Sequence, residues 1–414
     1  MSNQKSAIYN LQSAIENRQS AIGNPPRLDY VLLGVVLLLL LLGLIMIFSI
    51  TFPLRLQIGK EDPLRDFLNQ AQYAAAGLIA LFVCARVDYR VWKRLAIPLM
   101  VVTVGLLVVV LFAPPVNNSH RWLWGGSVQP AEFAKFALVV YMATWLSSKG
   151  EKLRQITYGL LPFAIIVGSV CGLILLEPNL STTGIIALCA LTMFFIAGAD
   201  VVQLLLLGIV GGGVAAIVVV QTPYQLQRFL IFQNPSAPSE GGAYQVMQGL
   251  NALGSGGLLG RGLGTGYAKF GFVPTPQNDY IFALLGEELG LVGTWFVLGL
   301  FLLLVYRGFC IAAQTRDLFG QILATGLTFG LVFQAFVNIG VVTAMLPPTG
   351  VPLPFISAGG SSLIVALMSV GVLLSISRAQ TLEGRYATFD FGWRYRGPRV
   401  PRLDRRPRAT RTRQ

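Results

Sequence analysis

The chain has 414 residues, of which 54% are hydrophobic and only 12% are charged. A typical soluble domain carries about 25% charged residues, so this composition and a mean hydropathy of +0.65 exclude a water-soluble globule, a secreted disulfide scaffold and a disordered chain. The four Cys residues lie in or beside apolar runs without CxxC spacing, and there is one His, so no zinc or thiol-redox site is expected. The remaining class is a polytopic membrane protein.

The apolar residues fall into ten segments, each close to the length of about 20 residues that crosses a bilayer as a helix. A polar arm, 1–26, precedes them, and we place the membrane domain at 27–378. The pattern predicts an all-α polytopic membrane protein with ten transmembrane helices and a large loop, 222–282, between helices seven and eight. The predicted spans are 31–52, 67–85, 95–113, 132–148, 159–176, 180–198, 201–221, 283–306, 318–343 and 361–377.

Lys and Arg residues are divided unevenly between the two sides that ten spans create. Counted by loop, 23 of the 31 lie on the side of the two termini and 8 on the other side. Because cytoplasmic loops carry the excess of Lys and Arg, we expect both termini in the cytoplasm. The large loop, 222–282, then faces outward.

The tail, 379–414, is the most basic part of the chain. Together with Arg378 it holds 11 Arg residues against three acidic ones, and it supplies +8 of the net charge of +13. Segments this basic bind anionic lipid or acidic partners rather than pack. The position beside the membrane favours lipid headgroups over nucleic acid. A topology anchor without a specific partner is the alternative.

The segment 120–135 places charges at the predicted outer boundary of the membrane. Glu132 and Lys135 are three residues apart on a predicted helix, so they share a face and are expected to pair. Arg121 and Lys135 either hold an anionic group or anchor the chain at the interface. The residue types alone leave both interpretations open.

A Gly-rich stretch, 254–266, lies in the large loop and has seven Gly in thirteen residues. Such a stretch can bring backbone N–H groups close to a ligand, although it contains no nucleotide-binding motif. Asp279 follows, just before an apolar helix, where it is either a functional carboxylate or a helix N-cap. Glu287 and Glu288 lie two turns into that helix and need a partner or a water-filled cavity.

The loop 344–360 is uncharged, rich in Pro and Gly, and apolar in its middle. Irregular backbone at membrane depth must be buried in protein or line a cavity, so we expect a re-entrant cover over a site. Upstream, Gln334 and Asn338 lie four residues apart on one helix face. Hydrogen bonding between helices is the simplest account of that pair.

Five segments together resemble the SEDS family of bacterial cell-wall proteins, the FtsW, RodA and SpoVE group. The resemblance covers about residues 30–378, and it leans toward the FtsW branch. It implies ten transmembrane helices, polymerisation of lipid II into peptidoglycan glycan strands, and a class B penicillin-binding protein as the crosslinking partner in a division or elongation complex. The segments are RWLWGGSVQPAEFAK, LEPNLSTTG, AYQVMQGLNALGSGGLLGRGLG, VPTPQNDYIFALLGEELGLVG and NIGVVTAMLPPTGVPLPFISAGGSS.

The catalytic Asp of that family lies in a motif usually written His-Thr-Asp-Phe-Ile-Phe, and Asp279 matches it by position. The flanks differ, since Gln277 and Asn278 replace His-Thr and Tyr280 replaces Phe. Because Asp279 itself is intact, the resemblance implies an active enzyme. Further departures from family motifs, one of which removes a carboxylate, are Asn179, Ser181, Ala131 and Ala358.

The implied reaction joins a GlcNAc 4-hydroxyl to the anomeric carbon of a MurNAc diphospholipid with one inversion, so a single base suffices. Asp279 is the predicted catalytic residue. The departing diphosphate needs cationic stabilisation from side chains or from a divalent cation, Mg²⁺ or Mn²⁺, with Asp279 as the candidate ligand. No organic cofactor is expected. The predicted substrate-binding residues are Arg121, Lys135, Glu132, Arg261, Lys269, Gln245, Glu288 and Ser361.

Two other classes of function fit the architecture: a lipid II flippase or transporter, and a non-catalytic scaffold of the cell-wall synthesis complex. Transporters usually show internal repeats and midplane charges, whereas these spans show no repeat and most charges lie at the predicted outer boundary. Loss of Asp279 would have favoured a scaffold. A peptidoglycan glycosyltransferase of the bacterial plasma membrane is therefore the leading hypothesis.

Overall fold

The computed structural model describes residues 28–57, 62–114, 121–123, 128–234, 242–273 and 277–383. The predicted arm and nearly all of the predicted tail lie outside these ranges. The described chain forms helices joined by loops. The α-helices are α2 (Tyr30–Gln57), α3 (Arg65–Arg86), α4 (Arg90–Leu111), α5 (Pro130–Lys149), α6 (Leu161–Leu176), α7 (Leu180–Ile196), α8 (Val201–Gln221), α9 (Pro223–Gln233), α10 (Gly242–Ser255), α11 (Ile281–Gln314), α12 (Leu318–Val342) and α13 (Gly360–Glu383).

All ten predicted spans coincide with helices, so the all-α fold class is confirmed. Within the described residues, eight helical segments are long and apolar enough to cross a membrane by length and composition. The two other predicted spans are α7, which has 17 residues, and α5, which carries Glu132 and Lys135 near its start. Most of α5 is nevertheless buried among its neighbours.

Polar side chains divide apolar runs that almost touch in the sequence. Asn179 accepts a hydrogen bond from the backbone N–H of Thr182 at the start of α7, and Asp200 accepts one from Val202 at the start of α8. Such caps satisfy backbone donors that a new helix leaves unpaired. Asn and Asp cap about equally well, so the carboxylate that Asn179 lacks is not needed for this turn.

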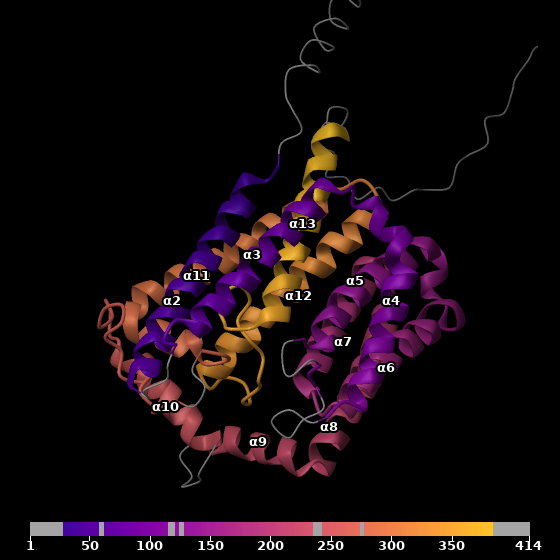
Figure 1. Ribbon diagram of the computed structural model, residues 1–414. Coiled ribbons are helices and arrows are strands. Elements are labelled where there is room, and N and C mark those ends of the chain that lie inside the picture. Colours follow the sequence, from indigo (N-terminus) through magenta and orange to yellow (C-terminus); the bar gives the residue numbers. More distant parts are fainter. Residues whose placement is uncertain are drawn as a thin grey trace, which may run out of the picture.

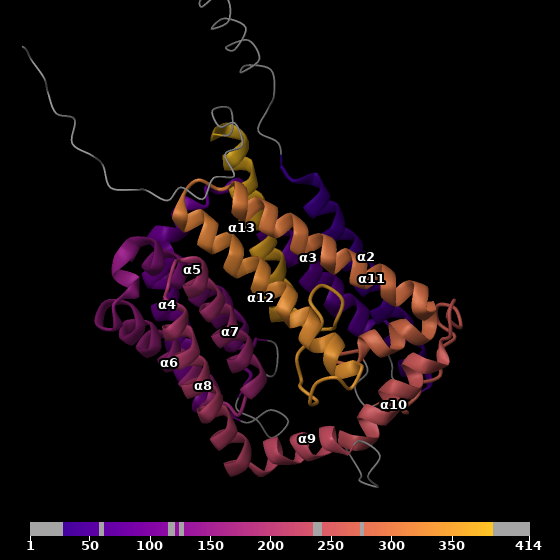
Figure 2. The ribbon, with the colours of Figure 1, turned by 180° about the vertical axis from the view of Figure 1, so that it is seen from behind.

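The helices α12 and α13 form the centre of the bundle (Figure 1). The helix α13 packs along α3, and α12 contacts α5, α7 and α11. Most of the apolar stretch of each is buried inside the protein. The helix α8 is the opposite case, because only 6% of its apolar stretch is buried and it contacts the bundle through α7 and α9 (Figure 2).

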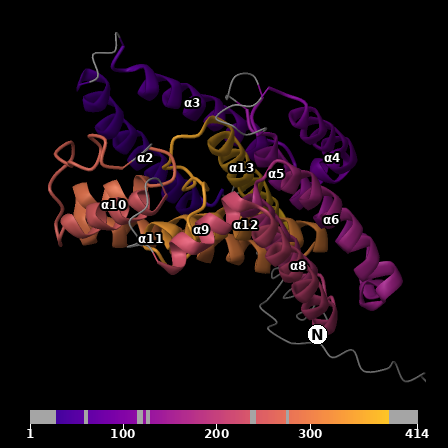
Figure 3. The same cartoon turned by 90° about the horizontal axis from the view of Figure 1, so that it is seen from below.

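The predicted loop 222–282 contains two helices, α9 and α10, that the sequence analysis did not predict. The helix α9 begins at Pro223, a residue suited to the first turn of a helix. It crosses one end of the bundle between α8 and α10 (Figure 3). We call this the Asp279 end. The start of α2 and the end of α13 lie at the opposite end (Figure 1).

The helix α11 is longer than the predicted span 283–306. Its 34 residues measure about 51 Å, more than the ~30 Å of a hydrocarbon core. A kink at Gly290, with φ 67° and ψ −166°, divides it. This φ favours glycine, so the short first part, with Glu287 and Glu288, can take a direction of its own.

The middle of the loop 344–360 is buried in the bundle, as the sequence predicts for re-entrant backbone, whereas Met345 and Leu346 at its start are exposed. Its apolar residues Leu353, Phe355 and Ile356 are almost fully enclosed. Gly43 of α2 makes room for them, because a Cβ at that position would lie 2.5 Å from the backbone oxygen of Phe355.

Candidate active site

Asp279 lies at the turn that leads into α11 and is half-buried. The N-cap position of α11 is taken by Tyr280, without a side-chain cap bond, so the interpretation of Asp279 as an N-cap is wrong. Burial raises the pKa of the Asp279 carboxyl to about 6, while its own backbone N–H and the charge of Arg228 act in the opposite direction. A carboxyl group that titrates near neutrality is suited to accept a proton in catalysis.

Arg121 is held by two backbone carbonyls. Its Nε donates to the carbonyl of Glu177 at 2.9 Å, and its Nη2 donates to that of Pro178 at 2.5 Å. Both bonds hold the guanidinium group in place, and among the residues that the structure describes no carboxylate forms an ion pair with it. The predicted cation is therefore present at the Asp279 end, held by neutral oxygens.

Arg228 of α9 is a second cation at this site, and the sequence analysis did not select it. Its charge acts on the pKa values of both Asp279 and Arg121, so it lies near both groups. Its guanidinium stacks on the ring of Tyr224, 4.5 Å from the centroid. The only sequence signal was its position among the few predicted outer cations, because α9 itself was not predicted.

Arg121 and Arg228 line one cavity of about 80 Å³. The amides of Gln129 and Gln225 and the segment 350–352 also line it. Among the described lining residues, the only carboxylate is Glu132, which already pairs with Lys135. Two guanidinium groups and amide donors around a small cavity are suited to a group with several anionic oxygens.

Glu177 sits beside this cavity as a buried carboxyl group that the sequence analysis did not select. It is fully enclosed, and neither carboxyl oxygen has a hydrogen-bond partner in the described part of the chain. Burial raises its pKa to about 8, and the charge of Arg121 lowers it in part. Glu177 is therefore largely neutral at pH 7, so it leaves the positive charge of Arg121 mostly uncompensated.

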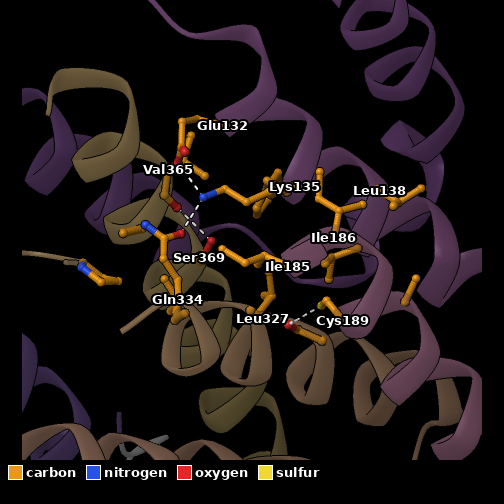
Figure 4. A pocket seen from close by; sticks show the side chains of 18 of the residues that line it. Glu132, Lys135, Leu138, Ile185, Ile186, Cys189, Leu327, Gln334, Val365 and Ser369 are labelled. Atoms are coloured by element: carbon orange, nitrogen blue, oxygen red, sulfur yellow. Dashed lines mark hydrogen bonds and ion pairs between the residues drawn. The ribbon is translucent and has the colours of Figure 1, made fainter. Parts of the chain in front are cut away.

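Glu132 and Lys135 form the predicted ion pair, with 2.7 Å between Oε2 and Nζ. The Lys135 ammonium also donates to Gln334 of α12 at 2.5 Å, and the amide of Gln334 donates to the backbone oxygen of Pro352 at 2.9 Å. Figure 4 shows Lys135 pointing between Glu132 and Gln334. A cavity of about 50 Å³, lined mostly by apolar side chains of α5, α7, α12 and α13, adjoins this polar cluster.

Lys269 and Glu288, both predicted to bind substrate, lie inside the protein instead. Their side chains are 0% and 1% exposed and form an ion pair of 2.9 Å. Lys269 also donates to the backbone oxygens of Ser49 and Gly264, and the hydroxyl of Ser49 donates to Glu288. This conformation leaves neither charge within reach of a substrate. The prediction for these two residues is corrected to an internal bridge between α2, α11 and the loop.

The Gly-rich stretch 254–266 docks on the kink of α11 rather than presenting its N–H groups to a ligand. The N–H of Arg261 donates to the carbonyl of Glu287, and the N–H of Gly264 donates to the Glu288 carboxylate. The carboxylate of Glu287 accepts bonds from two further loop N–H groups. The sequence suggested that a ligand would accept the hydrogen bonds of these loop N–H groups. In the structure, α11 accepts them instead.

The other predicted binding residues lie at three separate places. Arg261 is exposed, donates to the carbonyl of Ser255 and stacks on Tyr267. Gln245 is half-buried on α10. Ser361 is buried at the start of α13, where its hydroxyl accepts a bond from the N–H of Gln129 at 3.0 Å.

Metal binding rests on a sparse set of donors. The described residues contain no group of three or more His, Cys, Asp or Glu side chains that could hold a metal ion. Mg²⁺ is often bound through one or two carboxylates together with substrate phosphates and water. Asp279 therefore fits a divalent cation only when a phosphorylated ligand supplies further oxygens.

The chain is similar to a known family and to individual proteins of that family. The family of FtsW, RodA and SpoVE, described as cell cycle proteins, matches residues 29–382. Stage V sporulation protein E of Bacillus subtilis is 39% identical over 356 residues, which is 84% of this chain and 97% of that protein. A protein of Trichlorobacter lovleyi named as a probable peptidoglycan glycosyltransferase FtsW is 36% identical and covers 84% of this chain and 93% of its own.

Two solved structures are similar in fold. One, from a study of how a peptidoglycan synthase complex coordinates polymerization and crosslinking, has a TM-score of 0.71 and 27% identity, and covers 86% of this chain and 98% of its own. The other is the rod shape determining protein RodA of Thermus thermophilus, with a TM-score of 0.63 and 27% identity, covering 87% of this chain and 99% of its own.

Proposed function

The chain belongs to the FtsW, RodA and SpoVE family of cell cycle proteins, and we propose that it is a peptidoglycan glycosyltransferase that polymerises lipid II in cell division or elongation. The observation that carries the proposal is one half-buried carboxylate, Asp279, whose pKa the charge of Arg228 lowers, at the end of the bundle where Arg228 and Arg121 line one cavity. That combination supplies a base and an anion site, which glycosyl transfer from a diphospholipid requires.

Asp279 is the general base in this proposal. Its carboxylate accepts the proton of the GlcNAc 4-hydroxyl while that oxygen forms a bond to the anomeric carbon of the donor sugar. The bond from that carbon to the diphosphate breaks with its electron pair on the diphosphate. One inverting displacement turns an α-linked donor into a β-linked product, so no second nucleophile is needed.

Arg121 and Arg228 receive the diphosphate. Charged hydrogen bonds of this kind are worth about 1.5–3 kcal/mol each, and they are strongest in sites that exclude water. Lys135 is a weaker candidate than the sequence indicated, because Glu132 already neutralises it. A divalent cation, Mg²⁺ or Mn²⁺, held between Asp279 and the diphosphate would supply further neutralisation of charge.

The cellular setting follows from the same proposal. The protein is a multi-pass protein of the bacterial plasma membrane, the Asp279 end faces outward, and both termini are cytoplasmic, with the Arg-rich tail on anionic lipid. One of the similar solved structures comes from a peptidoglycan synthase complex that coordinates polymerization and crosslinking. We therefore assign a class B penicillin-binding protein as the partner of this chain.

The test is polymerisation of fluorescently labelled lipid II by the purified protein and its partner, with products resolved by gel. A glycosyltransferase makes glycan strands in detergent. A flippase makes none, but moves labelled lipid II across the bilayer of sealed vesicles. Translocation without strands, at any ratio of partner, would replace the proposed function with transport.

A further inference from the structure

Asn338 joins the candidate base to the re-entrant loop. It lies on α12 and is 1% exposed. Its Nδ2 donates to the backbone oxygen of Asp279 at 2.8 Å and to the backbone oxygen of Val351, also at 2.8 Å. A single amide group thus uses both of its hydrogens on carbonyls from two different loops.

The carbonyl of Asp279 lies just outside the hydrogen-bond ladder of α11. The N–H groups of Ala283 and Leu284 bond to the carbonyl of Tyr280, the next residue. Helical geometry therefore fixes the chain from Tyr280 onward and leaves the preceding peptide to be held by other groups. Because a buried carbonyl without a donor is costly, the amide of Asn338 largely determines where that peptide lies.

The loop bound by Asn338 is the same loop that lines the cation cavity. Residues 350–352 form part of the wall of the Arg121 and Arg228 cavity. A second strut joins the two loops, since the N–H of Ala358 donates to the carbonyl of Gln277 at 2.9 Å. One turn before Asn338, Gln334 holds Pro352 and accepts a bond from Lys135. These bonds therefore tie the turn that carries Asp279 to the loop that lines the cation cavity.

We propose that Asn338 is a positioning residue, which fixes the Asp279 carboxylate relative to the two guanidinium groups. This proposal rests on the proposed function of Asp279 as base. The sequence offered a simpler account, polar attachment between helices. The two accounts differ in consequence, because a displacement of about 1 Å of a catalytic group can cost about 10²-fold in rate, whereas a lost structural bond lowers stability alone.

The test compares variants of similar shape in the full-length protein with its partner. Asn338→Leu keeps the side-chain size and removes both donors. Asn338→Ser replaces the two amide donors with one hydroxyl donor. It serves as the second variant if Asn338→Leu does not fold. Thr325→Val is the matched control, since Thr325 is buried on the same helix and bonds within it, to the carbonyl of Gln321.

We expect Asn338→Leu to lower kcat on labelled lipid II about 10- to 100-fold, with KM changed less than about threefold. Asn338→Ser should fall between it and the wild type. In an Asp279→Asn background the same substitution should cost less than about threefold, because the group that Asn338 positions no longer acts. Thr325→Val should lower the Tm by a similar amount without lowering kcat.

The proposal is overturned if Asn338→Leu lowers kcat by the same factor with and without the Asp279 carboxylate, or if it raises KM alone, or if it behaves like Thr325→Val. In each of these cases, a large loss of activity in the Asp279→Asn variant would still support Asp279 as the general base, and only the role of Asn338 would be rejected. If Asp279→Asn retains full activity, the proposed role of Asp279 fails first.

Discussion

Two clusters of charge at the Asp279 end have opposite structures. Lys269 and Glu288 are buried and paired with each other, and their further partners come from α2 and the loop itself. Around Arg121 and Arg228 the guanidinium groups are held by carbonyl oxygens and an aromatic ring, next to a cavity. In the first cluster the charges neutralise each other and hold the loop in place. In the second cluster the positive charge is available to a ligand.

The difference shows why residue type alone could not rank these cations. Lys269 and Arg261 stood beside Arg121 as predicted binding residues, and Arg228 did not. Two features of the folded chain separate them: Lys269 pairs with the carboxylate of Glu288, and Arg261 is exposed and does not line the cavity that Arg121 and Arg228 share. Glu288 is 19 residues from Lys269 in the sequence, but only the kink at Gly290 and the docking of the Gly-rich stretch bring the two together.

Breaking the matched cluster should have the largest effect. Lys269→Met leaves the buried carboxylate of Glu288 without its cation, and the loss of one partner from a buried pair costs about 3–5 kcal/mol. Thermal unfolding in detergent should show a large drop in Tm. The double variant Lys269→Met/Glu288→Leu removes both charges and should regain most of that stability. A single variant as stable as the wild type would mean that the pair is not buried inside the protein.

Breaking the open cluster should affect activity and spare stability. Arg228→Met removes one contact to the diphosphate, worth about 1.5–3 kcal/mol, which corresponds to a rate loss of about 10- to 100-fold. Arg261→Met is the matched control, because Arg261 is exposed and has no part in the cavity. Polymerisation rates and Tm should be measured on both variants. Equal losses at the two positions would remove the distinction between the clusters.

A smaller effect is expected when the pH is lowered. The polymerisation rate should fall on the acid side of the pH–rate profile because Asp279 becomes protonated. With burial raising the pKa of Asp279 to about 6, the base is mostly ionised at pH 7 and mostly protonated at pH 5. The rate should therefore fall toward tenfold per pH unit below about 6 and level off above it. Measurements of kcat/KM between pH 5 and pH 8, at lipid II concentrations well below KM, give the profile of the free enzyme. A flat profile over that range would exclude a base in this environment.

Most of the fold could be predicted from the sequence because the membrane imposes length and hydropathy on each span. The residues of α2, α12 and α13 are apolar over a whole crossing, and their helices lie where the pattern puts them. The short helix α9 carries Gln225, Gln227 and Arg228 among its apolar residues. It has no strong period, so the cation on it was missed.

The site could be predicted only in part, and the reason is tertiary contact. Asp279 and Arg121 were selected, and the structure places both at the same end of the bundle. Asn338 was seen as a polar residue on an apolar helix, but its two acceptors lie 59 and 13 residues away. Glu177 lies in the segment LEPNLSTTG that carries the family resemblance, but its isolation from hydrogen-bond donors exists only in the folded chain.

The central claim is that the Asp279 carboxylate accepts a proton during glycosyl transfer. The most direct measurement is the rate of glycan-strand formation by Asp279→Asn at saturating labelled lipid II, with lipid II binding followed in the same preparation and Asp62→Asn, an exposed carboxylate, as the control. The account predicts a fall of at least about 10²-fold with binding retained and a normal rate for the control. Strand formation at the wild-type rate by Asp279→Asn would contradict it.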